Sequence, residues 1–180
     1  IRTGRAREIE AEPFTRRDGQ VRLFQTVKVP LEVDGRADHL LGVAVDVTER
    51  VRAEQALDGQ LRFQRSLLEA IPAPVFYKDA EGVYLGCNAA FEAFVGVSAG
   101  ALVGRTVHEM APPELAATYA QQDRRLLEAG GTQVYESQVR DAAGATHQVV
   151  FHKATFPDPD GRVGGLIGVM LDVSDLKETE

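Results

Sequence analysis

The sequence predicts a fold that combines antiparallel strands with helices, and an internal repeat is the main reason for this prediction. Residues 34–54 align without a gap with residues 160–180. Both blocks begin with Asp-Gly-Arg, continue through a strand-length apolar run and reach Asp-Val followed by Thr or Ser. Upstream, FQTVKVP (24–30) resembles FHKATFP (151–157). Residues 1–47 are therefore expected to be the last part of a module whose second copy is whole.

The composition excludes several classes of protein. Of the 180 residues 44% are hydrophobic, which is enough for a packed core, and 27 acidic against 20 basic side chains give a net charge of −7. This balance argues against nucleic acid as the main partner. The single cysteine, Cys87, excludes an internal disulfide and favours a reducing, cytoplasmic location. No apolar run approaches the ~20 residues of a membrane span, and a start at Ile1 without Met predicts a piece of a longer protein.

Three strands joined by tight turns are expected at the end of the chain, over 132–140, 147–156 and 163–173. The turns fall where proline presets φ and glycine allows positive φ, as in Pro157–Gly161. Both faces of the last strand are apolar, with Leu166, Gly168 and Met170 on one and Ile167, Val169 and Leu171 on the other. In an antiparallel sheet with one solvent-exposed face, apolar and polar residues would alternate along each strand. We therefore expect both faces to be covered, one by the module's own helices and the other by a flanking helix or a second subunit.

Two short strands and several helices are expected before these three strands. Asn88 is a suitable N-cap for a short helix that Gly96 ends. Proline is tolerated in the first turn of a helix, so Pro112-Pro113 can start a longer one that stops at Gly130-Gly131. The expected elements are strands over 74–79 and 83–87, a helix over 89–95, single helical turns over 98–103 and 105–110, and a long helix over 113–129.

A helical connector is expected between the two copies, over residues 48–70. Asp46 and Thr48 are rival caps for its start, and apolar residues recur at heptad spacing along it: Leu57, Leu61, Leu68 and Ile71, with Gln64 between them. This helix has two possible interpretations, a dimeric coiled coil and an amphipathic connector that packs on its own domain. Residues 7–47 are expected to form a small sheet on this helix or on another chain.

The order of the elements and four stretches of sequence resemble the PAS sensor domain family. The stretches are LLEAIPAPVFYKDAEGVYLGCNAAFEAFVG (67–96), SAGALVGRTVHEM (98–110), GLIGVMLDVS (165–174) and DVT (46–48) in the partial copy. The resemblance implies an α+β PAS fold with a five-stranded antiparallel sheet in the order 2-1-5-4-3, short helices on one face and a linker helix outside. It divides the chain into the C-terminal strands of a truncated PAS domain (1–47), a signalling linker (48–70), a complete PAS domain (71–174) and the start of a second linker helix (175–180).

The resemblance also implies a function. The chain is expected to be a sensory and signal-relay module of a multidomain bacterial signalling protein, with a histidine kinase or diguanylate cyclase as output domain in the same parent chain. No nucleophile–base pair or phosphate-binding loop is apparent, so the chain itself is not expected to be an enzyme. The alternative is a ligand-free dimerisation and relay scaffold. Signal relay is assigned to Asp46, Thr48, Asp172 and Ser174, where strands meet linker helices.

A homodimer is expected, through the linker helix or through the outer face of the sheet. The outer face is predicted to comprise Val150, Ala154, Phe156, Ile167, Val169 and Leu171.

The known cofactors of the family find little support here. Flavin photoreceptors of the LOV type carry a reactive cysteine where this sequence has Val107, and a glutamine where it has Met170. Haem-binding relatives use a histidine on the long helix, and residues 113–129 contain none. His147 and His152 are five residues apart on one strand, so they face opposite ways and cannot share a metal. Haem, LOV-type flavin and a metal are therefore not expected.

A small-molecule cavity or a filled core remains, and Lys78 is its unusual member. A buried lysine without a partner is costly, so Lys78 should reach solvent, pair with a carboxylate or meet an anionic ligand. Our hypothesis is that Lys78, with Tyr135 and Ser137, binds a small organic acid. By strand parity the ligand-binding set is Phe76, Lys78, Tyr84, Phe91, Tyr135, Ser137, Val149, Phe151 and Met170.

Overall fold

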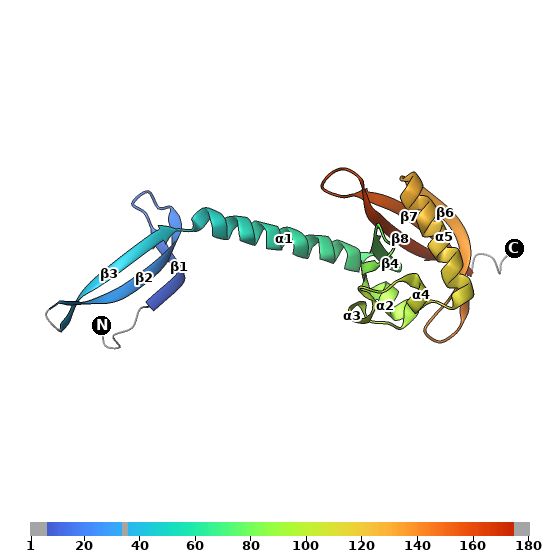
Figure 1. The fold of residues 1–180 in the computed structure, drawn as a ribbon, viewed down its shortest axis with the longest axis horizontal. Coiled ribbons are helices and arrows are strands. Elements are labelled where there is room, and N and C mark those ends of the chain that lie inside the picture. Colours follow the sequence, from blue (N-terminus) through green and yellow to red (C-terminus); the bar gives the residue numbers. More distant parts are fainter. Residues whose placement is uncertain (1–6, 34–35, 175–180) are drawn as a thin grey trace. The chain divides into compact units, whose positions relative to one another are not determined.

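The structure, a computed structural model, describes residues 7–33 and 36–174 and divides into two compact units, residues 1–64 and 65–180. The first unit holds a three-stranded antiparallel sheet of β1 (Arg7–Thr15), β2 (Val21–Val33) and β3 (Arg36–Asp46), in that order (Figure 1). Helix α1 (Thr48–Ala70) follows β3 and runs from this unit into the next.

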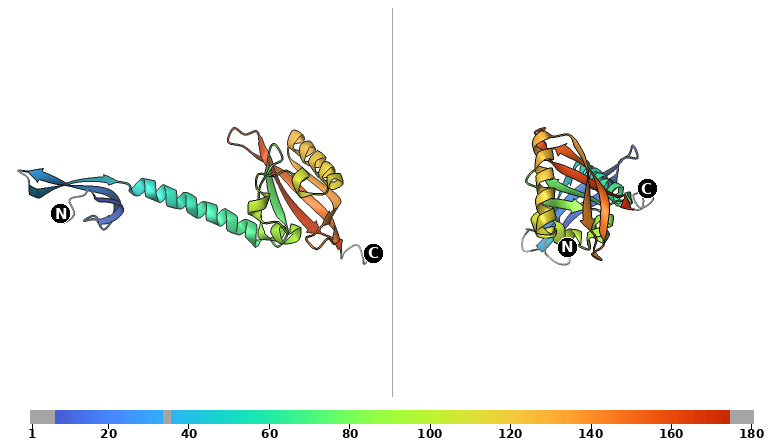
Figure 2. Two further views of the ribbon diagram at one scale, coloured as in Figure 1. Left: turned by 60° about the horizontal axis from the view of Figure 1, so that its bottom comes forward. Right: turned by 90° about the vertical axis from the view of Figure 1, so that its right-hand side faces the viewer.

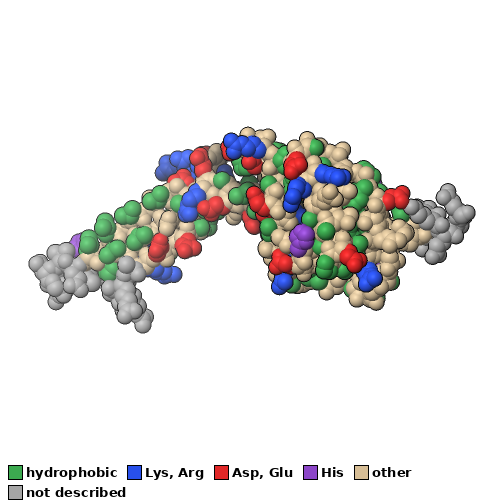
Figure 3. Space-filling model, turned by 45° about the vertical axis from the view of Figure 1, so that its right-hand side comes forward, with side chains coloured by type: hydrophobic (Ala, Val, Ile, Leu, Met, Phe, Trp, Pro, Cys, Tyr) green, Lys and Arg blue, Asp and Glu red, His purple; other side chains and the backbone are tan. Residues whose placement is uncertain are grey.

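Many apolar residues of the first unit are exposed. On β3, at the edge of the sheet, Leu40 and Val43 are 51% and 54% exposed, and Figure 3 shows apolar side chains in rows over this sheet. On α1, Leu57 and Leu61 are also more than half exposed. We expected the sheet to lie on this helix or on another chain, and the described residues of the sheet do not cover Leu57 and Leu61 of α1.

The second unit is built on a five-stranded antiparallel sheet in the order β5-β4-β8-β7-β6, which confirms the predicted order 2-1-5-4-3. Helix α5 packs on the inner face, against β7 and β8, as the views in Figure 2 show. The strands are β4 (Val75–Asp79), β5 (Tyr84–Cys87), β6 (Thr132–Arg140), β7 (Thr146–Pro157) and β8 (Val163–Asp172). The helices are α2 (Ala89–Val95), α3 (Ala99–Leu102), α4 (Val107–Met110) and α5 (Pro113–Ala129). The expected helix over 175–180 lies outside the described residues.

Local chemistry explains where the helices begin and end. The side chain of Asn88 accepts a hydrogen bond from the Phe91 amide at the start of α2, and Gly96 ends the helix in the left-handed conformation with φ of 75°. Gly130, with φ of 70°, follows α5. These ends agree with the sequence prediction, because caps of this kind are local signals.

Strand pairing corrects one part of the repeat alignment. In the first unit Lys28 lies opposite Gly42, and in the second Lys153 lies opposite Gly168. The second strands of the two copies therefore correspond at an offset of 125 residues, so that Lys28 matches Lys153 and Phe24 matches Val149. The sequence match of Phe24 with Phe151 was wrong by two residues. The alternation of apolar residues could not reveal this error, because a shift of two keeps every side chain on the same face of the sheet.

The two faces of β8 differ in burial. Leu166 and Met170 are buried on the inner face, where the ring of Phe76 lies over Gly168 at a distance that leaves no room for a Cβ atom. On the outer face Ile167 and Val169 are half-buried and Leu171 is 42% exposed. Among the described residues of the second unit, no helix or strand fully covers this outer face, which we expected to be covered.

Candidate functional site

A cavity of about 90 Å³ lies inside the second unit, between the sheet and the helices. Its walls are mostly aromatic and aliphatic, with basic groups among them. The residues that line it are Phe76, Lys78, Tyr84, Phe91, Val95, Leu102, Val107, Met110, Ala111, Pro112, Leu115, Tyr119, Val139, Arg140, Phe151, Lys153 and Met170. Four of these, Pro112, Leu115, Val139 and Arg140, also line a groove on the surface, so the cavity approaches solvent between the start of α5 and the end of β6.

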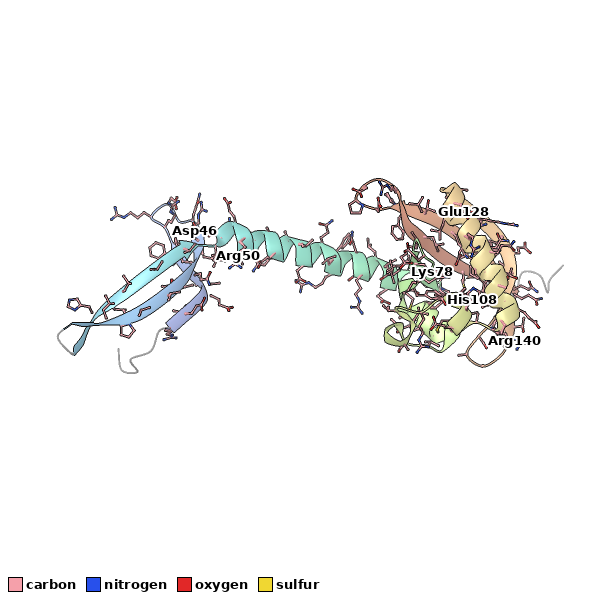
Figure 4. The ribbon with its side chains drawn as sticks, viewed as in Figure 1. Asp46, Arg50, Lys78, His108, Glu128 and Arg140 are labelled. Carbon is pink, nitrogen blue, oxygen red and sulfur yellow. The ribbon has the colours of Figure 1, made fainter. Side chains whose placement is uncertain are left out.

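Lys78 and Lys153, which line this cavity, form a buried charged cluster with Asp123. The Lys78 ammonium lies 2.6 Å from Asp123 Oδ2, and the Lys153 ammonium lies 2.5 Å from Oδ1. The three residues are 1–4% exposed and come from β4, α5 and β7. Figure 4 labels Lys78 inside the second unit. One carboxylate thus holds two ammonium groups together across the inner face of the sheet.

Burial and pairing act in opposite directions on these groups. Burial lowers the pKa of Lys78 and Lys153, while the charge of Asp123 opposes this shift. Burial alone would raise the pKa of Asp123, but the two ammonium groups outweigh it and hold that pKa below its ordinary value.

Aromatic rings complete the surroundings of the two ammonium groups. Lys78 Nζ lies 4.3 Å from the centre of the Tyr84 ring, and Lys153 Nζ lies 5.0 Å from the centres of both Phe151 and Tyr135. Such contacts stabilise a desolvated cation. The Tyr135 hydroxyl is buried and has no hydrogen-bond partner among the described residues.

The structure brings together six of the nine residues predicted for ligand binding. The cavity is lined by Phe76, Lys78, Tyr84, Phe91, Phe151 and Met170. Tyr135, Ser137 and Val149 lie outside its lining, and the ammonium of Lys78 contacts Asp123 rather than Tyr135 or Ser137. Pairing with a carboxylate was one of the three alternatives open for Lys78.

Sequence reasoning missed Asp123 and Lys153, although both leave a signal. Lys153 has the same parity along β7 as Val149 and Phe151, which were assigned to the inner face. Asp123 stands in the apolar stripe of α5, between Tyr119 and Leu126, where a charged residue needs a buried partner.

The same hydrogen-bonded latch ends the last strand of both copies. In the second unit, Asp172 Oδ1 accepts bonds from the amide and the hydroxyl of Ser174, whose hydroxyl oxygen accepts the amide of Gln148 on β7. In the first unit Asp46, Thr48 and the amide of Leu23 repeat this arrangement. The four residues predicted for signal relay therefore tie a strand end to the segment that follows and to the neighbouring strand.

The two latches differ in the cation beside them. His147 Nδ1 lies 2.7 Å from Asp172 Oδ2, and its Nε2 lies 3.1 Å from Asp141 Oδ2. At the matching position of the first unit, Arg22 lies 3.7 Å from Asp46. Hydrogen bonds to Asp141 and then Asp172 raise the pKa of His147 above its ordinary 6.5. A protonated imidazole donates to both carboxylates, whereas a neutral one donates to a single carboxylate.

This geometry predicts a pH dependence of stability. Because the folded-state pKa of His147 is raised, its contribution is fully present below pH 6.5 and is lost as the pH rises through the higher folded value. Urea unfolding of the wild type and of His147→Gln at pH 6 and pH 8 measures it. The wild type should lose more stability than the variant on going to pH 8, and equal losses would contradict the prediction.

Asn88 joins the end of α1 to the core of the second unit. Its side-chain NH2 group lies within hydrogen-bond distance of the carbonyls of Leu68, Ile71 and Ala73, which share its two hydrogens. Its oxygen accepts from the amides of Val75 and Phe91. The side chain is buried, with the residue 1% exposed. Asn88 thus connects the last turn of α1, the start of β4 and the start of α2.

Two kinds of site are absent from the described part of the chain. Over residues 7–33 and 36–174, no group of three or more His, Cys, Asp or Glu side chains could hold a metal ion. No helix in the same ranges is long and apolar enough to cross a membrane.

Comparison with known proteins gives a match to one family profile and similarity to bacterial sensor proteins. The profile of the family described as "PAS fold" matches residues 2–52 and 68–178. The virulence sensor protein BvgS of Bordetella pertussis is 31% identical over 135 residues, which cover 73% of this chain and 11% of BvgS. The C4-dicarboxylate transport sensor protein DctS of Rhodobacter capsulatus is 33% identical over 132 residues, 72% of this chain and 20% of DctS. The chain therefore spans between a tenth and a fifth of the length of these two relatives.

Solved structures agree with the sequence matches. The PAS domain of Bordetella pertussis BvgS superposes with a TM-score of 0.55 at 28% identity, covering 68% of this chain and 99% of that domain. The structure described as VqmA bound to DPO gives a TM-score of 0.57 at 29% identity, over 63% of this chain and 57% of VqmA. Since the family profile covers most of both units, this chain belongs to the PAS fold family.

Proposed function

We propose that the second unit senses a small organic acid in its interior cavity, as part of a multidomain bacterial signalling protein. The observation that carries the proposal is the cavity with the ammonium groups of Lys78 and Lys153 on its wall. Ligand pockets combine an apolar lining with a few convergent polar groups, and this cavity has both. Relatives that are sensor proteins support a sensory role, and one solved relative holds the small molecule DPO.

The path of the signal follows from the strands that line the cavity. Phe151 and Met170 lie opposite each other on β7 and β8, and both line the cavity. The same two strands carry the latch of Gln148, Asp172 and Ser174 at their ends. A ligand that moves Phe151 or Met170 would shift the two strands at that latch, and hence the linker that follows.

A ligand that enters the cavity should stabilise the protein against heat. The Tm of the 180-residue chain is measured with propionate, propionamide, succinate and DPO, compounds that differ in charge. At a concentration a hundred times Kd, binding adds about 2.7 kcal/mol, or several degrees in Tm. Val139→Phe, which fills the mouth of the cavity, should remove the effect. If no compound of any charge raised the Tm of the wild type, small-molecule sensing through this cavity would be wrong.

The second candidate is a ligand-free dimerisation and relay scaffold. Its supporting observation is exposed apolar surface, on the outer face of the sheet at Leu171 and along α1 at Leu57 and Leu61. A homodimer through either surface would bury these side chains. Both candidates place the chain in the cytoplasm, with an output domain such as a histidine kinase or a diguanylate cyclase in the same parent chain, and neither requires catalysis by this chain.

A further inference from the structure

We infer that the ligand carries a single negative charge on a short apolar body. This inference rests on the proposed function and narrows it to one class, small organic monoanions. The charged residues in the lining of the cavity are all basic: Lys78, Arg140 and Lys153. This bias stands out in a chain with a net charge of −7, and it excludes a cationic ligand.

The charge of the cluster sets the charge of the ligand. Lys78 and Lys153 bring two positive charges to the wall, and Asp123 balances one of them. A buried charge without a counterion is costly, and burial already lowers the pKa of both lysines. One negative charge beside them would complete the cluster and hold both lysines in the charged form. A neutral ligand would leave the excess charge in place. A dianion would bring a second charge for which the buried wall has no partner, since Arg140 lies exposed at the mouth of the cavity.

The ligand meets the ammonium groups rather than the carboxylate. Asp123 does not line the cavity and instead lines a separate hollow beside α4 and α5, together with His108 and Arg124. The two lysines therefore stand between the cavity and Asp123. Charge-assisted hydrogen bonds to a carboxylate are about twice as strong as neutral ones.

The size of the cavity limits the apolar part of the ligand. A volume of 90 Å³ is smaller than the ~150 Å³ of an apolar cavity that binds benzene, which suits an acid of a few carbon atoms. Arg140 is exposed and lines both the cavity and the surface groove next to it, so it attracts anions to the mouth.

Three compounds of similar size test the inference that the ligand carries a single negative charge, called the charge rule below. Propionate is a monoanion, propionamide is its neutral counterpart, and malonate is a dianion. Their binding to the 180-residue chain is measured by isothermal titration and by amide shifts of residues that line the cavity. We expect propionate to bind about tenfold or more tightly than either of the others.

Matched variants locate the preference in the cluster. Lys153→Met and Lys78→Met each leave one ammonium on Asp123, so the pair is neutral and the preference for propionate over propionamide should fall to near one. Lys28→Met removes the lysine at the matching position of the first unit and should change nothing. Two variants with the same prediction keep the test valid if one fails to fold.

The outcomes separate this inference from the proposed function. If propionamide or malonate bound the wild type as tightly as propionate, or if both lysine variants kept the preference, the charge rule would be overturned while sensing in the cavity would stand. If neither these compounds nor DPO bound in the cavity, the proposed function itself would fail, and the charge rule with it.

Discussion

Replacing Asp123 by Asn should lower the free energy of unfolding by about 3–5 kcal/mol, the usual cost of removing one partner from a buried ion pair. The side chain keeps its size, but Lys78 and Lys153 are left without the carboxylate that contacts them at 2.6 and 2.5 Å. Both lysines are buried, with only 1% and 4% of their surface exposed. Urea unfolding at pH 7, followed by circular dichroism, measures the change.

A second variant separates charge pairing from packing. In Lys78→Met, Asp123→Leu, Lys153→Met the whole cluster becomes apolar, and stability should return to within about 1 kcal/mol of the wild type or exceed it. This variant should also bind no organic acid. A loss below about 1 kcal/mol for Asp123→Asn alone would show that the cluster is not held by charge.

Replacing Asn88 by Ala should cost about 2–4 kcal/mol, because one buried side chain loses two accepted hydrogen bonds and two donor hydrogens that three carbonyls share. The amides of Val75 and Phe91 lose their acceptor, and three carbonyls near the end of α1 lose their donor. Hydrogen exchange of the Ile71 amide, which bonds to the Leu68 carbonyl, should become faster as the last turn of α1 loosens.

Asn88→Asp is the informative control for this junction. It keeps the oxygen that caps α2, but it replaces the donating NH2 group with a negatively charged oxygen that faces the carbonyls of Leu68, Ile71 and Ala73. The variant should therefore be at least as unstable as Asn88→Ala. An aspartate that left stability unchanged would mean that the linker is not held by these donations.

The architecture of the second unit could be predicted from the sequence because its signals are local. Turn residues such as Gly161, the cap Asn88 and the alternation along β8 are read over a few positions, and the resemblance to PAS domains supplied the order of strands. The same reading placed six of the nine proposed binding residues at the cavity, since parity along a strand fixes the face of the sheet.

The charged cluster could not be derived in this way. Lys78, Asp123 and Lys153 are far apart in the sequence, and their contact depends on how α5 crosses the sheet. The offset of β2 against β7 was wrong for a related reason, because the hairpin turns of the two copies differ in length and only pairing fixes the register.

The most direct test of the central claim is a titration of the chain with propionate in which amide shifts are followed at two places. Cavity residues such as Met170 report binding, and Gln148 and Ser174 report the latch at the end of β8. The account predicts that the latch amides shift with the same midpoint as the cavity amides, and that Lys153→Met moves both midpoints together. Saturation at the cavity with no movement of Gln148 and Ser174 would contradict it.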